Sequence, residues 1–178
     1  AASRRIGRRI LRNLGSERDQ TFLLRGPTGV DLAIMKVSNA AEDPATLDME
    51  ALAVLHAHRV DPTLPMALPR IVPGADPERD GAAAFRASVA GVGTDSSHFV
   101  RVYEVLPGLG RGDPGGLSDA AIADWGEMTA RLARALRGFF HPKAQRTMLW
   151  DIQHASRTRA MLADIHDPER RAAVAAVL

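Results

Sequence analysis

The sequence predicts an α+β fold: a five-stranded antiparallel sheet with one inserted helix, followed by a run of helices. Short apolar segments of period two, separated by turn residues, occupy much of the first 106 positions. Between residues 43 and 60 the apolar period becomes helical, and from residue 117 onward the apolar patterns are helical again. We therefore expect one domain at residues 1–106 and the start of a helical domain at residues 107–178.

The first three strands are expected to form a meander. Residues 9–14 fit either a helix or a strand, but the turn residues at 15–19 and a strand at 21–25 favour a hairpin. A second turn at 26–29 leads into a third strand at 31–37. Alternation along that strand places Leu32, Ile34 and Lys36 on one face.

A helix is expected after the third strand, because Asp43 can cap it and Pro44 suits its first turn. Its apolar stripe comprises Leu47, Ala51, Val54, Leu55 and His58. Residues 61–77 are rich in proline and contain at most a short strand. Two further strands are expected at 83–89 and 97–106, where Pro107 and Gly108 end the second.

The rest of the chain is expected to be helical. Ser118 can cap a helix that runs to Phe139. A second helix is expected at about 150–166, and a third after Asp167 and Pro168. The apolar side chains of the first helix that we expect to face the core are Ile122, Trp125, Met128, Leu132 and Leu136.

Composition is that of an ordinary globular protein. Of the 178 residues 46% are hydrophobic but only 4% aromatic, so the core must be mainly aliphatic. The absence of cysteine excludes disulfides, thiolate metal ligands and thiol nucleophiles. No apolar segment approaches the roughly 20 residues that span a bilayer, and the first residues lack the apolar core of a signal peptide. We expect a soluble, cytoplasmic protein that does not contact membranes.

Charge does not predict nucleic-acid binding. The 23 Lys and Arg residues are nearly balanced by 21 Asp and Glu residues, for a formal net charge of +2. One basic block stands out, and a solvated face explains it. The alternative is a nucleic-acid interface, whose affinity would fall steeply with salt, and we rank it last. The block consists of Arg4, Arg5, Arg8, Arg9 and Arg12.

Lys36 is the most informative single residue. It is one of two lysines in a chain that otherwise uses arginine for positive charge, and it occupies a strand face shared with apolar side chains. A compact ammonium suits an anion such as phosphate in a space too narrow for the planar fork of arginine. The alternative is a lysine of an edge strand that points into solvent.

Four segments follow one another along the chain: Leu14–Leu24, Ile34–Asn39, Leu47–Glu50 and Leu149–Ile152. In this order they resemble the aminoglycoside phosphotransferase family. The resemblance is closest to the hydroxylysine kinase branch and to phosphotransferase domains fused to class III aminotransferases. It implies a protein-kinase-like fold, with residues 1–106 as the nucleotide-binding lobe and 107–178 as the start of an incomplete helical lobe. The implied enzyme transfers the γ-phosphoryl group of ATP, with Mg²⁺, to a hydroxyl of an amino acid or amino alcohol such as hydroxylysine.

The resemblance also implies roles around the phosphates of ATP. Lys36 would hold the α- and β-phosphates, and Glu50 would pair with it, with Asp48 and Glu42 as weaker substitutes. The alternative for Glu50 is a solvated helix residue. A turn would cover the phosphates, although by itself it is an ordinary hairpin turn. That turn consists of Ser16, Glu17, Arg18, Asp19 and Gln20.

Two further segments would contact the adenine. Ile34 would touch its ring, although core packing explains this side chain equally well. The backbone of Glu104, Val105 and Leu106 would hydrogen-bond the adenine edge as the hinge between two lobes. An ordinary strand end is the alternative.

The residues that carry the family's chemistry are not in this sequence. The catalytic loop has the form His-x-Asp-x-x-x-x-Asn, and none of the six histidines begins it. We expect that loop, and the later aspartate that binds Mg²⁺, beyond Leu178, so no catalytic or metal-binding residue is assigned here. The chain begins without Met and ends within a helical pattern, so we expect part of a longer protein that is itself inactive. A non-catalytic, kinase-like nucleotide-binding module is the alternative.

Overall fold

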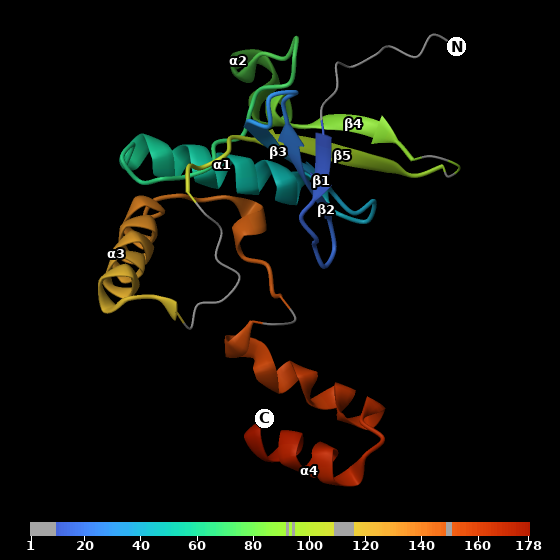
Figure 1. Cartoon of the computed structure of the whole chain (residues 1–178). Helices are drawn as coiled ribbons and strands as arrows, with labels where there is room; N and C mark the ends of the chain where they lie inside the picture. Colours follow the sequence, from blue (N-terminus) through green and yellow to red (C-terminus); the bar gives the residue numbers. More distant parts are fainter. Residues whose placement is uncertain (1–9, 92, 94, 109–115, 149–150) are drawn as a thin grey trace. The chain divides into compact units, whose positions relative to one another are not determined.

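The computed structural model describes residues 10–91, 93, 95–108, 116–148 and 151–178. The described residues form two compact units, which divide between Phe140 and His141. The first unit combines an antiparallel sheet with helices, which confirms the predicted α+β class (Figure 1). Helix α3 (Asp119–Ala135), expected in a second domain, belongs to this first unit.

The sheet has five antiparallel strands in the order β1-β2-β3-β5-β4. The predicted initial hairpin and third strand are confirmed, because β1 pairs with β2 and β2 with β3. Strand β5 lies between β3 and β4, with Lys36 opposite Arg101 and Ile34 opposite Tyr103. The strands are β1 (Ile10–Asn13), β2 (Gln20–Arg25), β3 (Asp31–Val37), β4 (Ala87–Ala90) and β5 (Ser97–Tyr103).

Local chemistry shapes the connection between β1 and β2. Gly15 has a φ of 75°, a left-handed conformation that costs glycine little because it has no Cβ. Its N–H donates to Oδ1 of Asn13 at 2.8 Å, and the N–H of Leu14 donates to the carbonyl of Thr21 at 2.9 Å. These bonds close the hairpin and bring residues 16–19 to one end of the sheet.

Helix α1 (Pro44–Val60) follows β3 and is capped as predicted, since the Asp43 side chain accepts a hydrogen bond from the N–H of Ala45 at 2.9 Å. Leu47 and Ala51 of the predicted stripe are buried. Ala51 packs with Ala84 and Phe85 in the core. This packing holds the middle of α1 against the segment that contains Ala84 and Phe85.

The strand predicted at 83–89 is wrong in its first half. Residues Pro77–Asp80 form α2 and Gly81–Phe85 form the 3₁₀ helix η1, so β4 begins only at Ala87. The neighbours Ala84 and Phe85 are both buried against α1. A strand would turn two consecutive side chains to opposite faces, whereas a helical turn buries both in one place. The strand predicted to reach Leu106 ends at Tyr103.

Helix α3 (Asp119–Ala135) is capped as predicted by Ser118, whose hydroxyl accepts from the N–H of Ala121 at 3.2 Å. The expected burial of its apolar face is wrong, because Trp125 is 55% exposed and three neighbours on that face are also exposed. Helix α3 contacts α1 through another face, where Ala135 is buried and Arg131 pairs with Asp61. The exposed neighbours are Ile122, Met128 and Leu132.

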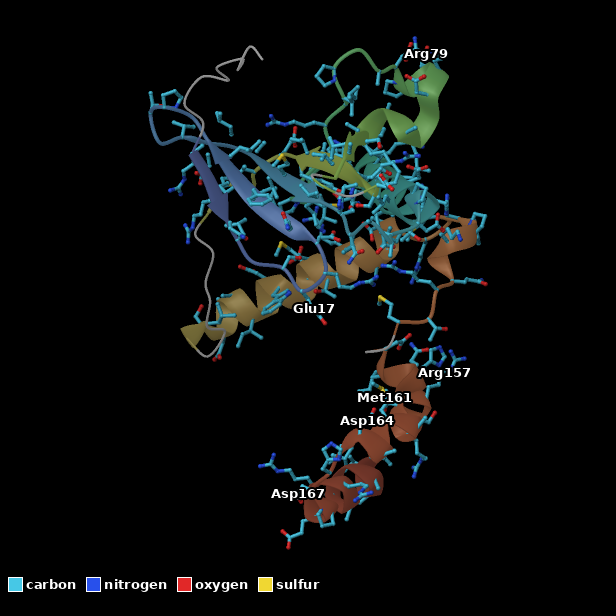
Figure 2. The ribbon with its side chains drawn as sticks, turned by 90° about the vertical axis from the view of Figure 1, so that its right-hand side faces the viewer. Glu17, Arg79, Arg157, Met161, Asp164 and Asp167 are labelled. Carbon is cyan, nitrogen blue, oxygen red and sulfur yellow. The ribbon has the colours of Figure 1, made fainter. Side chains whose placement is uncertain are left out.

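The second unit contains η3 (Pro142–Ala144), η4 (Ile152–Asp164) and α4 (Pro168–Val177). The helices predicted at about 150–166 and after Pro168 are found there, although the first is a 3₁₀ helix. Residues Leu149 and Trp150 lie outside the described residues. Figure 2 labels the side chain of Asp167, which caps α4 by accepting from the N–H groups of Glu169 and Arg170. In the described part of the chain, no helix has the length and apolar character to cross a membrane.

Candidate anion-binding site

The pairing of β3 with β5 places two cations side by side. Lys36 and Arg101 are directly opposite each other in the antiparallel register, so their side chains leave the same face of the sheet. Arg101 is buried, with a side chain 2% exposed, whereas the Lys36 side chain is 34% exposed. Like charges in this arrangement repel each other, so the fold must supply carboxylates nearby.

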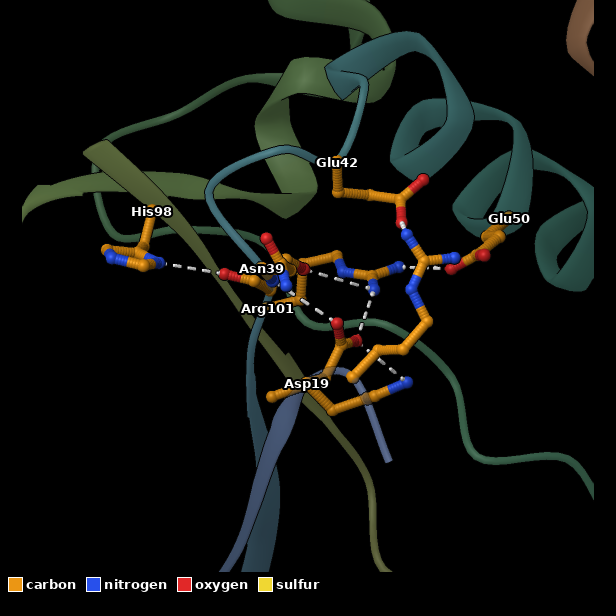
Figure 3. Close-up of polar contacts among 9 residues, drawn as sticks. Asp19, Asn39, Glu42, Glu50, His98 and Arg101 are labelled. Carbon is orange, nitrogen blue, oxygen red and sulfur yellow. Dashed lines mark hydrogen bonds and ion pairs between the residues drawn. The ribbon is translucent and has the colours of Figure 1, made fainter. Parts of the chain in front are cut away.

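Two carboxylates from other elements balance these cations (Figure 3). Asp19, at the end of the β1–β2 connection, places Oδ2 3.5 Å from Nζ of Lys36 and 3.8 Å from Nη2 of Arg101. Glu50, on α1, places Oε2 2.7 Å from Nη1 of Arg101. We call these four residues, Lys36, Arg101, Asp19 and Glu50, the two-cation site.

The segment that follows β3 ties the two-cation site together. The N–H of Asn39 donates to Oδ1 of Asp19 at 3.3 Å, and the buried hydroxyl of Ser38 accepts from Nη2 of Arg101 at 3.5 Å. Nδ1 of His98 lies 3.0 Å from the carbonyl oxygen of Ser38 (Figure 3). The same short segment therefore contacts β5 and the β1–β2 connection before it enters α1.

The predicted ion-pair partner of Lys36 needs correction. The resemblance implies that Lys36 pairs with Glu50, but the carboxylate beside the Lys36 ammonium is that of Asp19, and Glu50 contacts Arg101. The suggested substitutes for Glu50 have other partners, because Asp48 pairs with Arg86 at 2.6 Å and Glu42 with Arg18 at 3.5 Å. The physical reason is the register of β3 and β5, which places a second cation, Arg101, beside Lys36, and Glu50 pairs with that cation.

The turn that the resemblance assigns to the phosphates lies in the connection between β1 and β2. Ser16 and Glu17 are exposed there, and Glu17 is labelled in Figure 2. Arg18 reaches Glu42, Asp19 enters the two-cation site, and Gln20 is the first residue of β2. The structure therefore brings Asp19 from this turn to Lys36.

The residues predicted to contact adenine lie at the end of β5 and on the neighbouring strand. Ile34 is half-buried opposite Tyr103, on the same face as the two cations. The N–H of Glu104 donates to the carbonyl of Leu68 at 3.0 Å, so this donor is already used within the fold. An adenine edge would therefore have to use the carbonyl of Glu104 or the backbone of Val105 and Leu106.

Sequence reasoning missed Arg101. A signal was present, because Arg101 stands between Val100 and Val102 in an apolar strand, where a solvated charge is unexpected. Its partner across the sheet could not be predicted from that pattern.

Tyr103 borders Arg101, with its ring centroid 5.8 Å from Cζ of Arg101. Burial raises the pKa of Tyr103 above its ordinary value, and the charge of Arg101 opposes that shift.

A hollow of about 540 Å³ opens at the same end of the sheet. Ser38, Asn39 and His98 contribute to its lining, together with Val37 and Val89. Its lining includes neither Lys36 nor Arg101. Arg18 also lines the hollow, but its side chain is 52% exposed and pairs with Glu42. We place the candidate site at Lys36 and Arg101 because the sheet holds two positive charges side by side there.

No protein-family model matches the chain, and no curated protein matches it. Arg4, Arg5, Arg8 and Arg9 of the basic block lie outside the described residues. The candidate site therefore stands on the geometry of the described residues, and in particular on the two cations and their carboxylates.

Proposed function

We propose that the first unit is the nucleotide-binding part of an ATP-dependent phosphotransferase, in which Lys36 binds the phosphates of ATP. The acceptor that we propose is a hydroxyl group of an amino acid or amino alcohol, such as hydroxylysine. One observation carries this proposal: the Lys36 ammonium lies on a central strand, beside a buried arginine and within 3.5 Å of a carboxylate from the β1–β2 connection.

The order of the elements supports the proposal. Protein kinases cover the phosphates with a loop between their first two strands, carry the phosphate-binding lysine on the third strand and a glutamate on the next helix. This chain has the β1–β2 connection, Lys36 on β3 and Glu50 on α1 in the same order. It departs from that pattern in the partner of the glutamate, which is Arg101.

The residues present suit the phosphates of ATP better than they suit its metal. Lys36 and Arg101 would hold the phosphates, and ATP would supply the phosphoryl group. Among the described residues, no three His, Asp or Glu side chains gather into a metal site. The sequence contains no His-x-Asp-x-x-x-x-Asn. We therefore expect these 178 residues to bind ATP without transferring its phosphoryl group.

Calorimetric titration with ATP tests the role of Lys36. We expect Lys36→Met to weaken ATP binding by roughly 10- to 100-fold, the effect of losing one contact between a charged group and phosphate. Lys143→Met is the matched control, because Lys143 is the other lysine of the chain and belongs to the second unit. Equal ATP affinities of Lys36→Met and the unchanged chain would contradict the proposal.

A non-catalytic nucleotide-binding module is the second candidate, favoured by the absence of a catalytic loop from the sequence. The enzyme and the binding module differ in whether the full-length protein forms a phosphorylated product. Incubation with ATP and 5-hydroxylysine, followed by mass spectrometry, should detect phosphorylated hydroxylysine if the protein is an enzyme. ATP binding without any phosphorylated amino acid or amino alcohol would favour the binding module.

A further inference from the structure

We propose that Lys36 and Arg101 form a single polyphosphate-binding site, in which the carboxylate of Asp19 occupies the place of the anion until the anion binds. This inference rests on the proposed function, because Lys36 is the proposed phosphate ligand. It adds a second cationic ligand, Arg101, and an internal competitor, Asp19. The chemical class of the ligand is a chain of phosphates, free or attached to a nucleoside.

One oxygen atom of Asp19 already bridges the two cations. Oδ2 lies 3.5 Å from Nζ of Lys36 and 3.8 Å from Nη2 of Arg101. A phosphate oxygen in the same position would face both cations at once. Because Lys36 and Arg101 are opposed across β3 and β5, the sheet holds them side by side without help from the ligand.

Arg101 has donors left for a ligand. Its guanidinium carries five N–H groups. Nη1 donates to Oε2 of Glu50 at 2.7 Å. Nη2 makes a long contact of 3.5 Å with the hydroxyl of Ser38. Nε is buried and has no hydrogen-bond partner in the part of the chain that the structure describes. A buried unpaired donor is costly, and phosphate oxygens are the acceptors that arginine binds best.

The two carboxylates of the two-cation site are held differently. Glu50 contacts Arg101 at a normal hydrogen-bond distance from the rigid helix α1. The contacts of Asp19 are all longer, with 3.3 Å to the N–H of Asn39 as the shortest that the structure shows. Asp19 also belongs to a connection whose neighbouring residues are exposed. Glu50 therefore anchors Arg101, whereas Asp19 is the carboxylate that an incoming anion displaces.

Substitution of Asp19 by Asn provides the decisive test. The amide keeps Oδ1 as an acceptor for the N–H of Asn39 but removes the negative charge. In calorimetric titrations of the full chain at constant ionic strength, Asp19→Asn should bind both tripolyphosphate and ATP more tightly. We expect roughly 5- to 50-fold, because a competitor inside the protein lowers the apparent affinity by the fraction of open sites. Adenosine affinity should not change.

Asp31→Asn is the matched control, because Asp31 pairs with Arg25 at 2.5 Å at the other end of β3. It should leave the tripolyphosphate affinity unchanged. Arg101→Lys keeps a positive charge opposite Glu50 but loses Nε, and should weaken tripolyphosphate binding about tenfold. Thermal unfolding shows which variants are folded. If Arg101→Lys does not fold, the affinity of Asp19→Asn for tripolyphosphate decides whether the proposal stands.

Unchanged or weaker tripolyphosphate binding by Asp19→Asn would overturn the proposal, and unchanged binding by a folded Arg101→Lys would overturn the part played by Arg101. Two further outcomes separate a failure of the polyphosphate site from a failure of the proposed ATP-binding function. If ATP bound no better than tripolyphosphate, the nucleotide claim would fail while the polyphosphate site stood. If Lys36→Met lost ATP while Asp19→Asn changed nothing, the internal competitor would fail and the nucleotide site would stand.

Discussion

Replacing Glu50 by Gln should destabilise the protein, because Arg101 would lose its nearest counter-ion while its own charge stays buried. The Arg101 side chain is 2% exposed, and Oε2 of Glu50 lies 2.7 Å from its Nη1. Breaking a fully buried ion pair costs about 3–5 kcal/mol. The Glu50 side chain is 37% exposed and Asp19 remains 3.8 Å from Nη2, so we expect a cost below that range, about 2 kcal/mol.

Urea unfolding followed by circular dichroism measures this loss as a lower midpoint at an unchanged slope. Glu42→Gln is the matched control, because Glu42 pairs at 3.5 Å with Arg18, whose side chain is 52% exposed. The Glu42 side chain is 15% exposed, but its partner projects into solvent at a longer distance, so this pair should contribute less than the Glu50–Arg101 pair, about 1 kcal/mol. If Glu50→Gln is as stable as the unchanged chain, or if Glu42→Gln loses as much stability, burial of the Arg101 charge does not determine the cost.

Three further predictions concern the pKa of two side chains and one helix cap. Burial raises the pKa of Tyr103 above its ordinary 10.0. The contribution of the buried, neutral tyrosine to the free energy of unfolding is therefore complete below pH 10.0 and is lost as pH rises through the raised pKa. Ultraviolet titration of this single tyrosine should therefore show a midpoint above 10.0, and a midpoint at or below it would contradict the burial. Hydrogen bonds from Arg131 and Thr63 hold the pKa of Asp61 below its ordinary 3.8. Asp61→Asn should thus lower the urea midpoint at neutral pH, and the difference should shrink as pH falls through that lowered pKa; a difference independent of pH would count against the ion pair. Ser118→Ala should cost about 1 kcal/mol in urea unfolding, because it removes the cap of α3, and an unchanged midpoint would show that the cap contributes nothing.

Much of the fold could be predicted because its signals are local. The caps at Asp43 and Ser118 were predicted from the residues themselves, and the structure shows both side chains accepting backbone N–H groups. The initial hairpin was predicted from turn residues between two apolar runs. Such features depend on residues within a few positions of one another, so the sequence displays them directly.

Two predictions were wrong, the strand at 83–89 and the core face of α3, because burial against other elements decides both features. Apolar residues at 83–85 resembled a strand, but contact with α1 favours a helical turn that buries Ala84 and Phe85 together. The apolar stripe of α3 indicated a core face, yet Trp125 is exposed in the first unit, because a periodic pattern does not say which element covers it.

The sequence by itself determined that a rare lysine, Lys36, ends an apolar strand before a helix that carries Glu50, because these features are read from neighbouring residues. Only the tertiary structure decided which charges meet. The register of β3 and β5 brings Arg101 beside Lys36, and the β1–β2 connection adds Asp19. Ion pairs depend on distances between segments far apart in the chain, and the alternation of apolar residues within one strand contains no information about those distances.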